Sequence, residues 1–320
     1  MDFDFLHKYM YFQTPWCSLS SITGFFGILN KTERKKKIMK IRTLAIVMAL
    51  VMCVSVMLTG CGGNKETMLT DNKLTVAMEC SYAPYNWTQS DDSNGAVPIK
   101  GSSDYAYGYD VMMAKIIAEK LGMELEIVKT DWDSLVLAVQ SGTADCVIAG
   151  QSITSERLQS VDFTKPYYYA SIVALTKSNS KYANATSVAD LEGAVCTSQI
   201  NTVWYDTCLP QIKNANILPA QETSSAMLVA LNSGKCDLVV TDMPTALAAC
   251  VAYKDFKLLD FTNNADGNFN VSEEEINIGI SVKKGNTELA DKINSILDTF
   301  TADDFAKMMD DAIAVQPLSD

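Results

Sequence analysis

The sequence has almost no histidine. The only one, His7, lies among the first 60 residues, which have the features of a leader. Once the leader is removed, no imidazole is left for a Ser-His or Cys-His catalytic pair or for a histidine metal site. We therefore expect no catalytic residue, no metal site and no cofactor, and we expect that the chain is not an enzyme.

The cysteines also lack a pattern that would bind metal, because none of their spacings is C-x-x-C. Export would permit disulfides, but a core of this size does not need them for stability. Buried free thiols are our first expectation and one or more disulfides the alternative. The six cysteines concerned are Cys80, Cys146, Cys196, Cys208, Cys236 and Cys250.

Basic residues are outnumbered, with 26 Lys and Arg against 38 Asp and Glu. The first 60 residues hold eight of the basic and three of the acidic side chains, so the remainder has a net charge of about −17. So acidic a surface repels nucleic acid and anionic lipid. No nucleic-acid partner is expected.

The apolar run of the leader, residues 44–58, is too short for a membrane-spanning helix, which needs roughly 20 residues. It follows a basic stretch and ends in Leu58-Thr59-Gly60-Cys61. Residues 39–60 thus resemble a lipoprotein signal peptide, with an uncleaved anchor as the alternative. The resemblance implies that Cys61 is acylated, for example with palmitate, and that residues 61–71 tether the chain to the outer face of the cell membrane. Residues 1–38 are then an extension that a start at Met39 would leave untranslated.

Two stretches of the remaining chain share one pattern. Residues 135–150 read LVLAVQSGTADCVIAG and residues 227–242 read MLVALNSGKCDLVVTD. In each, an apolar helix end is followed by Ser-Gly, an Asp and a short apolar run. Gly142 and Gly234 fit the left-handed position after a helix, and the apolar runs fit buried strands. Two copies of one helix-to-strand unit predict two similar α/β lobes.

Strands and helices alternate through the rest of the chain. Strands are predicted at residues 74–78, 124–128, 195–196 and 238–240, and helices at 111–121, after 201, and at 243–252. Alternation of this kind predicts mostly parallel sheets flanked by helices. Ligands of such sheets bind beyond the carboxyl ends of the strands, which points to residues 149–152 in one lobe and to Thr241 and Asp242 in the other.

Opposite charges occur at these two places. Arg157 follows Ser152 by five residues around a predicted helix start and could grip a carboxylate, a role that we weigh equally with a surface salt bridge. Asp242 follows a buried strand, where capping of the next helix is the commoner role of a single Asp. If the two residues face each other across a cleft, they describe a site for a zwitterion, the part that all α-amino acids share.

A series of motifs extends this interpretation to nearly the whole chain. The motifs are Tyr82-Ala83-Pro84-Tyr85, Gly108-Tyr109-Asp110, Trp132-Asp133-Ser134-Leu135, Gly142-x-x-Asp145, Ser152-Ile153-Thr154-Ser155-Glu156-Arg157 and Asp162-Phe163-Thr164-Lys165-Pro166-Tyr167. In this order they resemble the family 3 extracellular solute-binding proteins, the polar amino-acid receptors of ABC importers, over residues 73–309. The resemblance implies a two-lobed periplasmic-binding fold of type 2, with residues 72–169 and 278–320 in lobe 1, residues 170–277 in lobe 2 and two hinge crossovers.

The resemblance also implies roles for particular residues. Arg157 would bind the α-carboxylate of the ligand and Asp242 its α-ammonium. Further hydrogen bonds would come from Gly150, Ser152, Thr202 and Asn201, although Asn201 replaces the small residue that the family usually has there. Tyr82 and Trp132 would flank the ligand's side chain, with core packing as the alternative for both, and Glu79 would contact its far end. A cationic amino acid is the first expectation for the ligand.

The function that follows is that of a monomeric, lipid-anchored receptor, which closes on an amino acid and delivers it to the permease and ATPase subunits of an importer. One alternative is a dehydratase-like enzyme on the same scaffold, for which Glu79 is the obvious general acid. Another is a sensory binding module, which would take the same ligand but report to a different partner.

Overall fold

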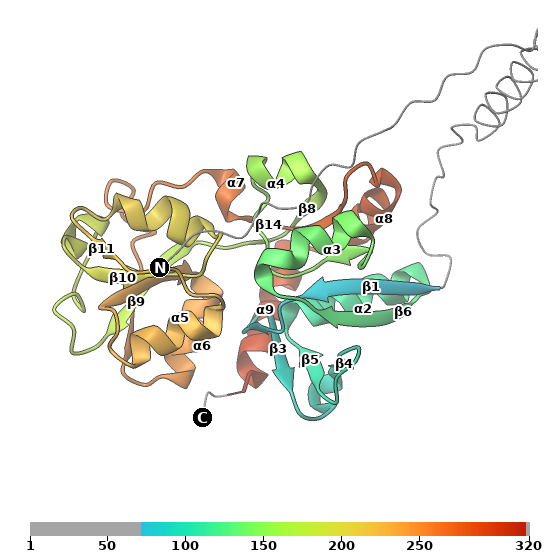
Figure 1. The fold of residues 1–320 in the computed structure, drawn as a ribbon, viewed down its shortest axis with the longest axis horizontal. Coiled ribbons are helices and arrows are strands. Elements are labelled where there is room, and N and C mark those ends of the chain that lie inside the picture. Colours follow the sequence, from blue (N-terminus) through green and yellow to red (C-terminus); the bar gives the residue numbers. More distant parts are fainter. Residues whose placement is uncertain (1–71, 318–320) are drawn as a thin grey trace, which may run out of the picture. The chain divides into compact units, whose positions relative to one another are not determined.

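The computed structural model of the chain describes residues 72–317 (Figure 1). The predicted leader and the whole tether, including Cys61, lie outside the described residues, so the signal peptide and the lipid anchor stay predictions. Between residues 72 and 317, no helix combines the length and the apolar character that crossing a membrane requires.

The first of two five-stranded sheets has the order β6-β1-β7-β14-β8. Strands β6, β1 and β7 run parallel, whereas β14 is antiparallel to both β7 and β8. We call the part of the chain built on this sheet lobe 1. Its strands are β1 (Lys73–Met78), β6 (Glu124–Lys129), β7 (Cys146–Val147), β8 (Val161–Tyr169) and β14 (Asn277–Lys283). Its helices are α2 (Tyr109–Leu121), α3 (Leu135–Ser141), α4 (Ser155–Ser160), α8 (Thr287–Leu297) and α9 (Ala302–Val315).

The second sheet repeats this plan, with the order β11-β10-β12-β9-β13. Strands β11, β10 and β12 are parallel, and β9 is antiparallel to β12 and β13. We call the part built on it lobe 2. Its strands are β9 (Ile172–Lys177), β10 (Val195–Thr197), β11 (Asn216–Ile217), β12 (Leu238–Asp242) and β13 (Phe256–Leu259), and its helices include α5 (Ser224–Asn232), α6 (Met243–Ala252) and the short α7 (Glu273–Ile276).

A third, small sheet of short antiparallel strands projects from lobe 1. It follows directly on β1 and precedes α2, in the order β2-β3-β5-β4. Its members are β2 (Ser81–Tyr82), β3 (Asn86–Gln89), β4 (Val97–Pro98) and β5 (Tyr105–Tyr107).

The internal repeat corresponds to the same structural unit in both lobes. Gly142 and Gly234 have φ angles of 79° and 74°, in the left-handed region that favours glycine. The Asp of each copy has the same task, since Asp145 Oδ2 accepts the backbone N–H of Thr75 at 2.8 Å and Asp237 Oδ2 that of Val195 at 3.0 Å. Each carboxylate thus holds the start of the neighbouring parallel strand, which accounts for the position of the Asp in the repeat.

The antiparallel strands are the part of the fold that the alternating pattern did not include. The chain passes from the first sheet to the second between Tyr169 and Ile172, and it re-enters the first sheet at Asn277. At this return, Ala170 N donates to Ile276 O at 2.9 Å. The parallel pairings join the predicted strands, except that β10 also pairs with β11, which was not predicted. The antiparallel strands β8, β9 and β14 flank the two crossovers.

All six cysteines between residues 72 and 317 are free thiols, and all except the half-buried Cys250 are buried. Burial raises their pKa, for example that of Cys80 to about 12, so these thiols stay protonated and unreactive at neutral pH.

Candidate functional site

The predicted site residues come together where the carboxyl ends of parallel strands from both sheets meet. Glu79 directly follows β1, Gly150 lies three residues after β7, and Asp242 is the last residue of β12. Direct side-chain contacts join the lobes at this place, among them a hydrogen bond from Tyr82 of lobe 1 to Asp242 of lobe 2.

Asp242 caps the next helix, which is one of the two roles considered for it, and it also contacts lobe 1. Its side chain is 1% exposed. Oδ1 accepts the backbone N–H of Thr245 at 2.8 Å and so caps α6, whereas Oδ2 accepts the hydrogen bond from the hydroxyl of Tyr82. Burial raises the pKa of Asp242, and the hydrogen bonds from Tyr82 and Thr245 lower it again.

Arg157 reaches from α4 towards lobe 2. Its Nη1 donates to Ser152 O at 2.9 Å and its Nη2 to Asn201 O at 3.0 Å. The guanidinium carbon lies 5.4 Å from the ring centre of Trp132, within cation–π range. Burial lowers the pKa of Arg157 to about 10, which leaves the group protonated at neutral pH. Both hydrogen bonds are to carbonyl oxygens, so the arrangement differs from the surface salt bridge considered as the alternative.

The helix start near Arg157 offers fewer free N–H groups to an anion than the sequence suggested. Helix α4 has only six residues, and the Thr154 hydroxyl accepts the backbone N–H of Arg157 at 3.3 Å. The cap therefore satisfies one of the N–H groups that an anion would need. The guanidinium itself remains as the group suited to a carboxylate.

Glu79 is the second buried carboxylate of the site, with 3% exposure. The Ser81 hydroxyl donates to its Oε1 at 2.9 Å, and Gln199 Nε2 of lobe 2 lies 3.3 and 3.2 Å from its two oxygens. Burial raises the pKa of Glu79, and the hydrogen bonds from Ser81 and Gln199 oppose the rise. Sequence reasoning missed Gln199. Its position two residues after β10, at the carboxyl end of a parallel strand, is the signal that could have found it.

Asn201 and Thr202 form the turn that faces Arg157. Asn201 has a φ of 54°, a conformation that asparagine tolerates better than most residues, and its Nδ2 donates to Asp133 Oδ1 of lobe 1 at 2.8 Å. The Thr202 hydroxyl donates to Gln199 O at 2.7 Å. The helix predicted after Asn201 is a short π-helix, Trp204–Cys208.

Aromatic side chains surround these polar groups. Tyr82 and Trp132 are 1% and 8% exposed. The Tyr82 ring stacks on the ring of Tyr85, with 4.6 Å between the ring centres, and makes an edge contact with Trp204, with 5.9 Å between the ring centres. The ring also lies so close to Gly150 that a Cβ there would come within 2.5 Å of it, and Gly150 has a φ of 63°. Glycine is therefore required at this position for two independent reasons.

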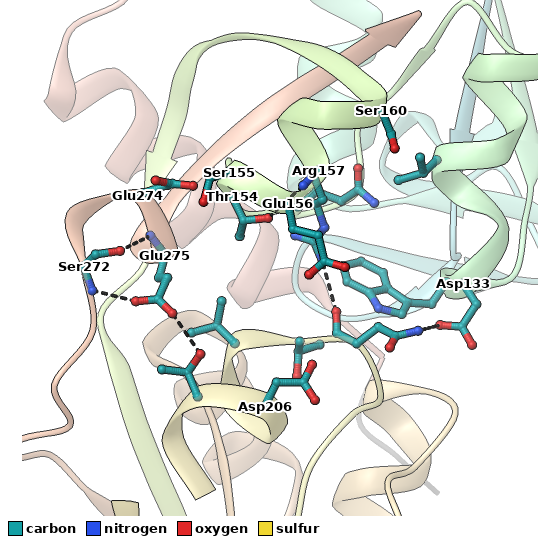
Figure 2. A pocket seen from close by; sticks show the side chains of 17 residues that line it. Asp133, Thr154, Ser155, Glu156, Arg157, Ser160, Asp206, Ser272, Glu274 and Glu275 are labelled. Atoms are coloured by element: carbon teal, nitrogen blue, oxygen red, sulfur yellow. Dashed lines mark hydrogen bonds between the residues drawn. The ribbon is translucent and has the colours of Figure 1, made fainter. Parts of the chain in front are cut away.

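Two cavities of very different size adjoin Arg157. The smaller, of about 20 Å³, has room for about one water molecule. The larger, of about 510 Å³, shares Trp132, Arg157, Thr202 and Val203 with it and has several carboxylates in its wall (Figure 2). Six of the predicted site residues line the smaller cavity together with Val203 and Trp204, which the sequence did not single out. These six are Tyr82, Trp132, Gly150, Ser152, Arg157 and Thr202.

The sequence profile of the bacterial extracellular solute-binding proteins, family 3, matches residues 74–312. The chain belongs to this family. One relative is a probable histidine-binding protein of Campylobacter jejuni, which is 30% identical over 224 residues, or 68% of this chain and 80% of the relative.

Solved structures of other binding proteins have the same fold. An amino-acid ABC transporter substrate-binding protein of Streptococcus pneumoniae bound to L-arginine is 25% identical, with a TM-score of 0.63 over 76% of this chain and 95% of that one. An ancestral amino acid-binding protein described as a precursor of cyclohexadienyl dehydratase is 27% identical, with a TM-score of 0.61 over 76% and 96% of the two chains. The two-lobed α/β architecture predicted from the sequence is thus confirmed, and these three similar proteins are all named as binding proteins.

Proposed function

We propose that this family 3 protein is the receptor of an ABC importer and that its ligand is a cationic amino acid such as L-arginine. The observation that carries the proposal is the charge of the site. One guanidinium, Arg157, and two buried carboxylates, Glu79 and Asp242, converge where the lobes meet. A cationic amino acid carries the complementary set of one carboxylate and two cationic groups.

Each charge of the ligand then has a partner. The α-carboxylate binds Arg157, with help from Ser152, Gly150 and the Asn201-Thr202 turn, and the α-ammonium binds Asp242. The ring of Trp132, which lies within cation–π range of the guanidinium, and the ring of Tyr82 flank the aliphatic part. The side-chain cation reaches Glu79. Buried charges require such pairing, because an unpaired ion is costly to remove from water.

The ligand can reach the site only if the lobes separate, because the smaller cavity beside Arg157 has a volume of only about 20 Å³. We assign residues 72–169 and 277–317 to lobe 1 and residues 170–276 to lobe 2, one residue from the predicted bound because Asn277 begins β14, with the crossovers near Tyr169 and Asn277 acting as a hinge. The ligand favours closure because only the closed form brings Arg157 and Asp242 to it together. The importer then recognises the closed receptor, which binds without catalysis and acts as a monomer.

The location follows from the leader. The family acts outside the cytoplasm, and we propose that Cys61 carries the lipid that holds this member at the outer face of the membrane. Metabolic labelling with radioactive palmitate should mark the wild-type chain in the membrane fraction. A Cys61→Ser variant should be unlabelled. Labelling that persisted in the variant would refute the assignment of the lipid to Cys61.

The ligand class is tested by calorimetry on the mature chain with L-arginine and its uncharged isostere L-citrulline. We expect micromolar or tighter binding of arginine and at least tenfold weaker binding of citrulline, because only arginine offers a cation to Glu79. Glu79→Gln should remove this preference. Equal binding of the two ligands by the wild type would refute the cationic assignment, and binding of no amino acid would refute the receptor itself.

A further inference from the structure

One buried carboxylate lies behind the proposed ligand site, and its only hydrogen-bond interaction with the site residues is with the backbone N–H of Gly150. Asp110, in the first turn of α2, is 0% exposed. Its Oδ1 accepts the Tyr167 hydroxyl at 2.6 Å and its Oδ2 accepts Asn86 Nδ2 at 2.7 Å. Asp110 belongs to the Gly108-Tyr109-Asp110 motif, to which the proposed function gives no role.

The Tyr167 branch leads to one wall of the site. The hydroxyl of Tyr167 accepts the backbone N–H of Gly150 at 3.1 Å while it donates to Asp110. Gly150 lines the small cavity and lies against the Tyr82 ring. The hydroxyl can donate only one hydrogen, so its orientation towards Gly150 depends on an acceptor at Asp110.

The Asn86 branch leads to the other wall. Asn86 Oδ1 accepts the backbone N–H of Cys80 at 2.6 Å. Cys80 has a φ of 55°, which is strained for a residue other than glycine, and it sits between Glu79 and Ser81 in the turn that leads to Tyr82. The amide of Asn86 can present its oxygen to Cys80 only if its Nδ2 finds an acceptor on the opposite side, and Asp110 is that acceptor.

We infer that Asp110 is a positioning residue, whose carboxylate fixes the Gly150 loop and the Cys80 turn together and so sets the distance between the two walls of the ligand site. The inference rests on the proposed function for its effect on ligand binding, but not for its structural content. A group at this position must accept on both oxygens. This requirement explains why a carboxylate is kept in a buried place where burial alone disfavours it.

The requirement leads to a charge-swap experiment. In Asp110→Asn, the new amide can still accept from Tyr167, but its NH₂ group faces the NH₂ group of Asn86. The side-chain amide of Asn86 must then rotate by half a turn, which places its NH₂ group against the backbone N–H of Cys80, so that two donors face each other. In the double variant Asn86→Asp with Asp110→Asn, the carboxylate at 86 accepts from both Cys80 and the new amide, while that amide accepts from Tyr167. Every hydrogen bond of the network is restored.

The first readout is hydrogen exchange of the unliganded mature chain at about pH 8, where Asp110 is ionised, followed by mass spectrometry on peptides that cover Cys80 and Gly150. We expect Asp110→Asn to speed exchange around Cys80 and to spare Gly150, and Tyr167→Phe to do the reverse. The double variant should restore wild-type exchange at both. Unchanged exchange at Cys80 in Asp110→Asn, or no recovery in the double variant, would overturn the inference. If Asp110→Asn alone does not fold, the double variant still decides.

The second readout is the affinity for L-arginine. Asp110→Asn should weaken binding by about tenfold or more, and the double variant should recover to within about threefold of the wild type. A residue that only stabilised the fold would lower the melting temperature without this recovery of affinity. If the wild type bound no amino acid, the proposed function would fall, and hydrogen exchange would still test Asp110.

Discussion

Replacement of Tyr82 by phenylalanine removes a single hydroxyl from the contact between the lobes. That hydroxyl donates to Asp242, and both side chains are 1% exposed. The ring keeps its stacking on Tyr85 and its edge contact with Trp204, because neither involves the hydroxyl. The variant therefore isolates one hydrogen bond to the carboxylate that we assign to the ligand's ammonium.

The size of the effect follows from competition for Asp242. A ligand ammonium must take the oxygen that Tyr82 now occupies, and a hydrogen bond to a charged group contributes about 1.5–3 kcal/mol. Without the hydroxyl, this contribution no longer opposes the ligand. At about 1.4 kcal/mol for each factor of ten, Tyr82→Phe should bind L-arginine about tenfold or more tightly than the wild type.

Isothermal titration calorimetry of the mature chain measures this change. Tyr85→Phe is the matched control, because the Tyr85 hydroxyl is buried in the same stack but has no hydrogen-bond partner among the described residues. The control should leave the affinity for arginine within about twofold of the wild type. If Tyr82→Phe instead bound arginine tenfold more weakly than both, the hydroxyl would be a contact of the ligand and not its competitor.

Further perturbations test the buried charges. Asp242→Ala should lower arginine affinity by about a hundredfold or more, since it removes the proposed partner of the ammonium; calorimetry on a variant shown by circular dichroism to be folded would check this. Without ligand, the melting temperature should fall as the pH rises from 5 to 7.5. Burial raises the pKa of Asp110 to about 7 in the folded chain, against about 3.8 when unfolded, even though Tyr167 and Asn86 lower it and Asp242 raises it further. Stability from this group is complete below the unfolded value and is lost as the pH passes through the folded one. Differential scanning calorimetry should find a smaller loss in Asp110→Asn, and a melting temperature that rose over this range would contradict the assignment.

Much of the fold could be predicted because local pattern determines it. The helix expected at residues 243–252 is α6 with the same bounds, and the repeated Ser-Gly units end helices as expected at Gly142 and Gly234. In both cases the signal is carried by neighbouring residues, as apolar periodicity or as a backbone conformation that glycine alone adopts easily.

Contacts between the lobes were harder to anticipate. Gln199 and Trp204 become part of the site through Glu79 and Tyr82, which are more than one hundred residues away in the chain. Their partners depend on how lobe 2 meets lobe 1, and nothing in the local sequence encodes this. The antiparallel strands of the crossovers were missed for a related reason, since their pairing joins Tyr169 to Asn277 across the whole of lobe 2.

The contacts between the lobes bear on selectivity as well as on closure. Three groups of the protein occupy the positions that we assign to the three polar groups of a cationic amino acid. The Tyr82 hydroxyl lies at Asp242, the Gln199 amide at Glu79 and the Asn201 carbonyl at Arg157. All three are neutral dipoles.

A ligand that binds must therefore exchange these dipoles for its own groups. An ion gains more than a dipole from a buried opposite charge, because the interaction is stronger where water is excluded. An amino acid with an uncharged side chain gains at Asp242 and Arg157, but at Glu79 it only replaces one amide by another neutral group. Under the proposed assignment, a cationic ligand is therefore favoured twice, through the charge of Glu79 and through the presence of Gln199 as its neutral competitor.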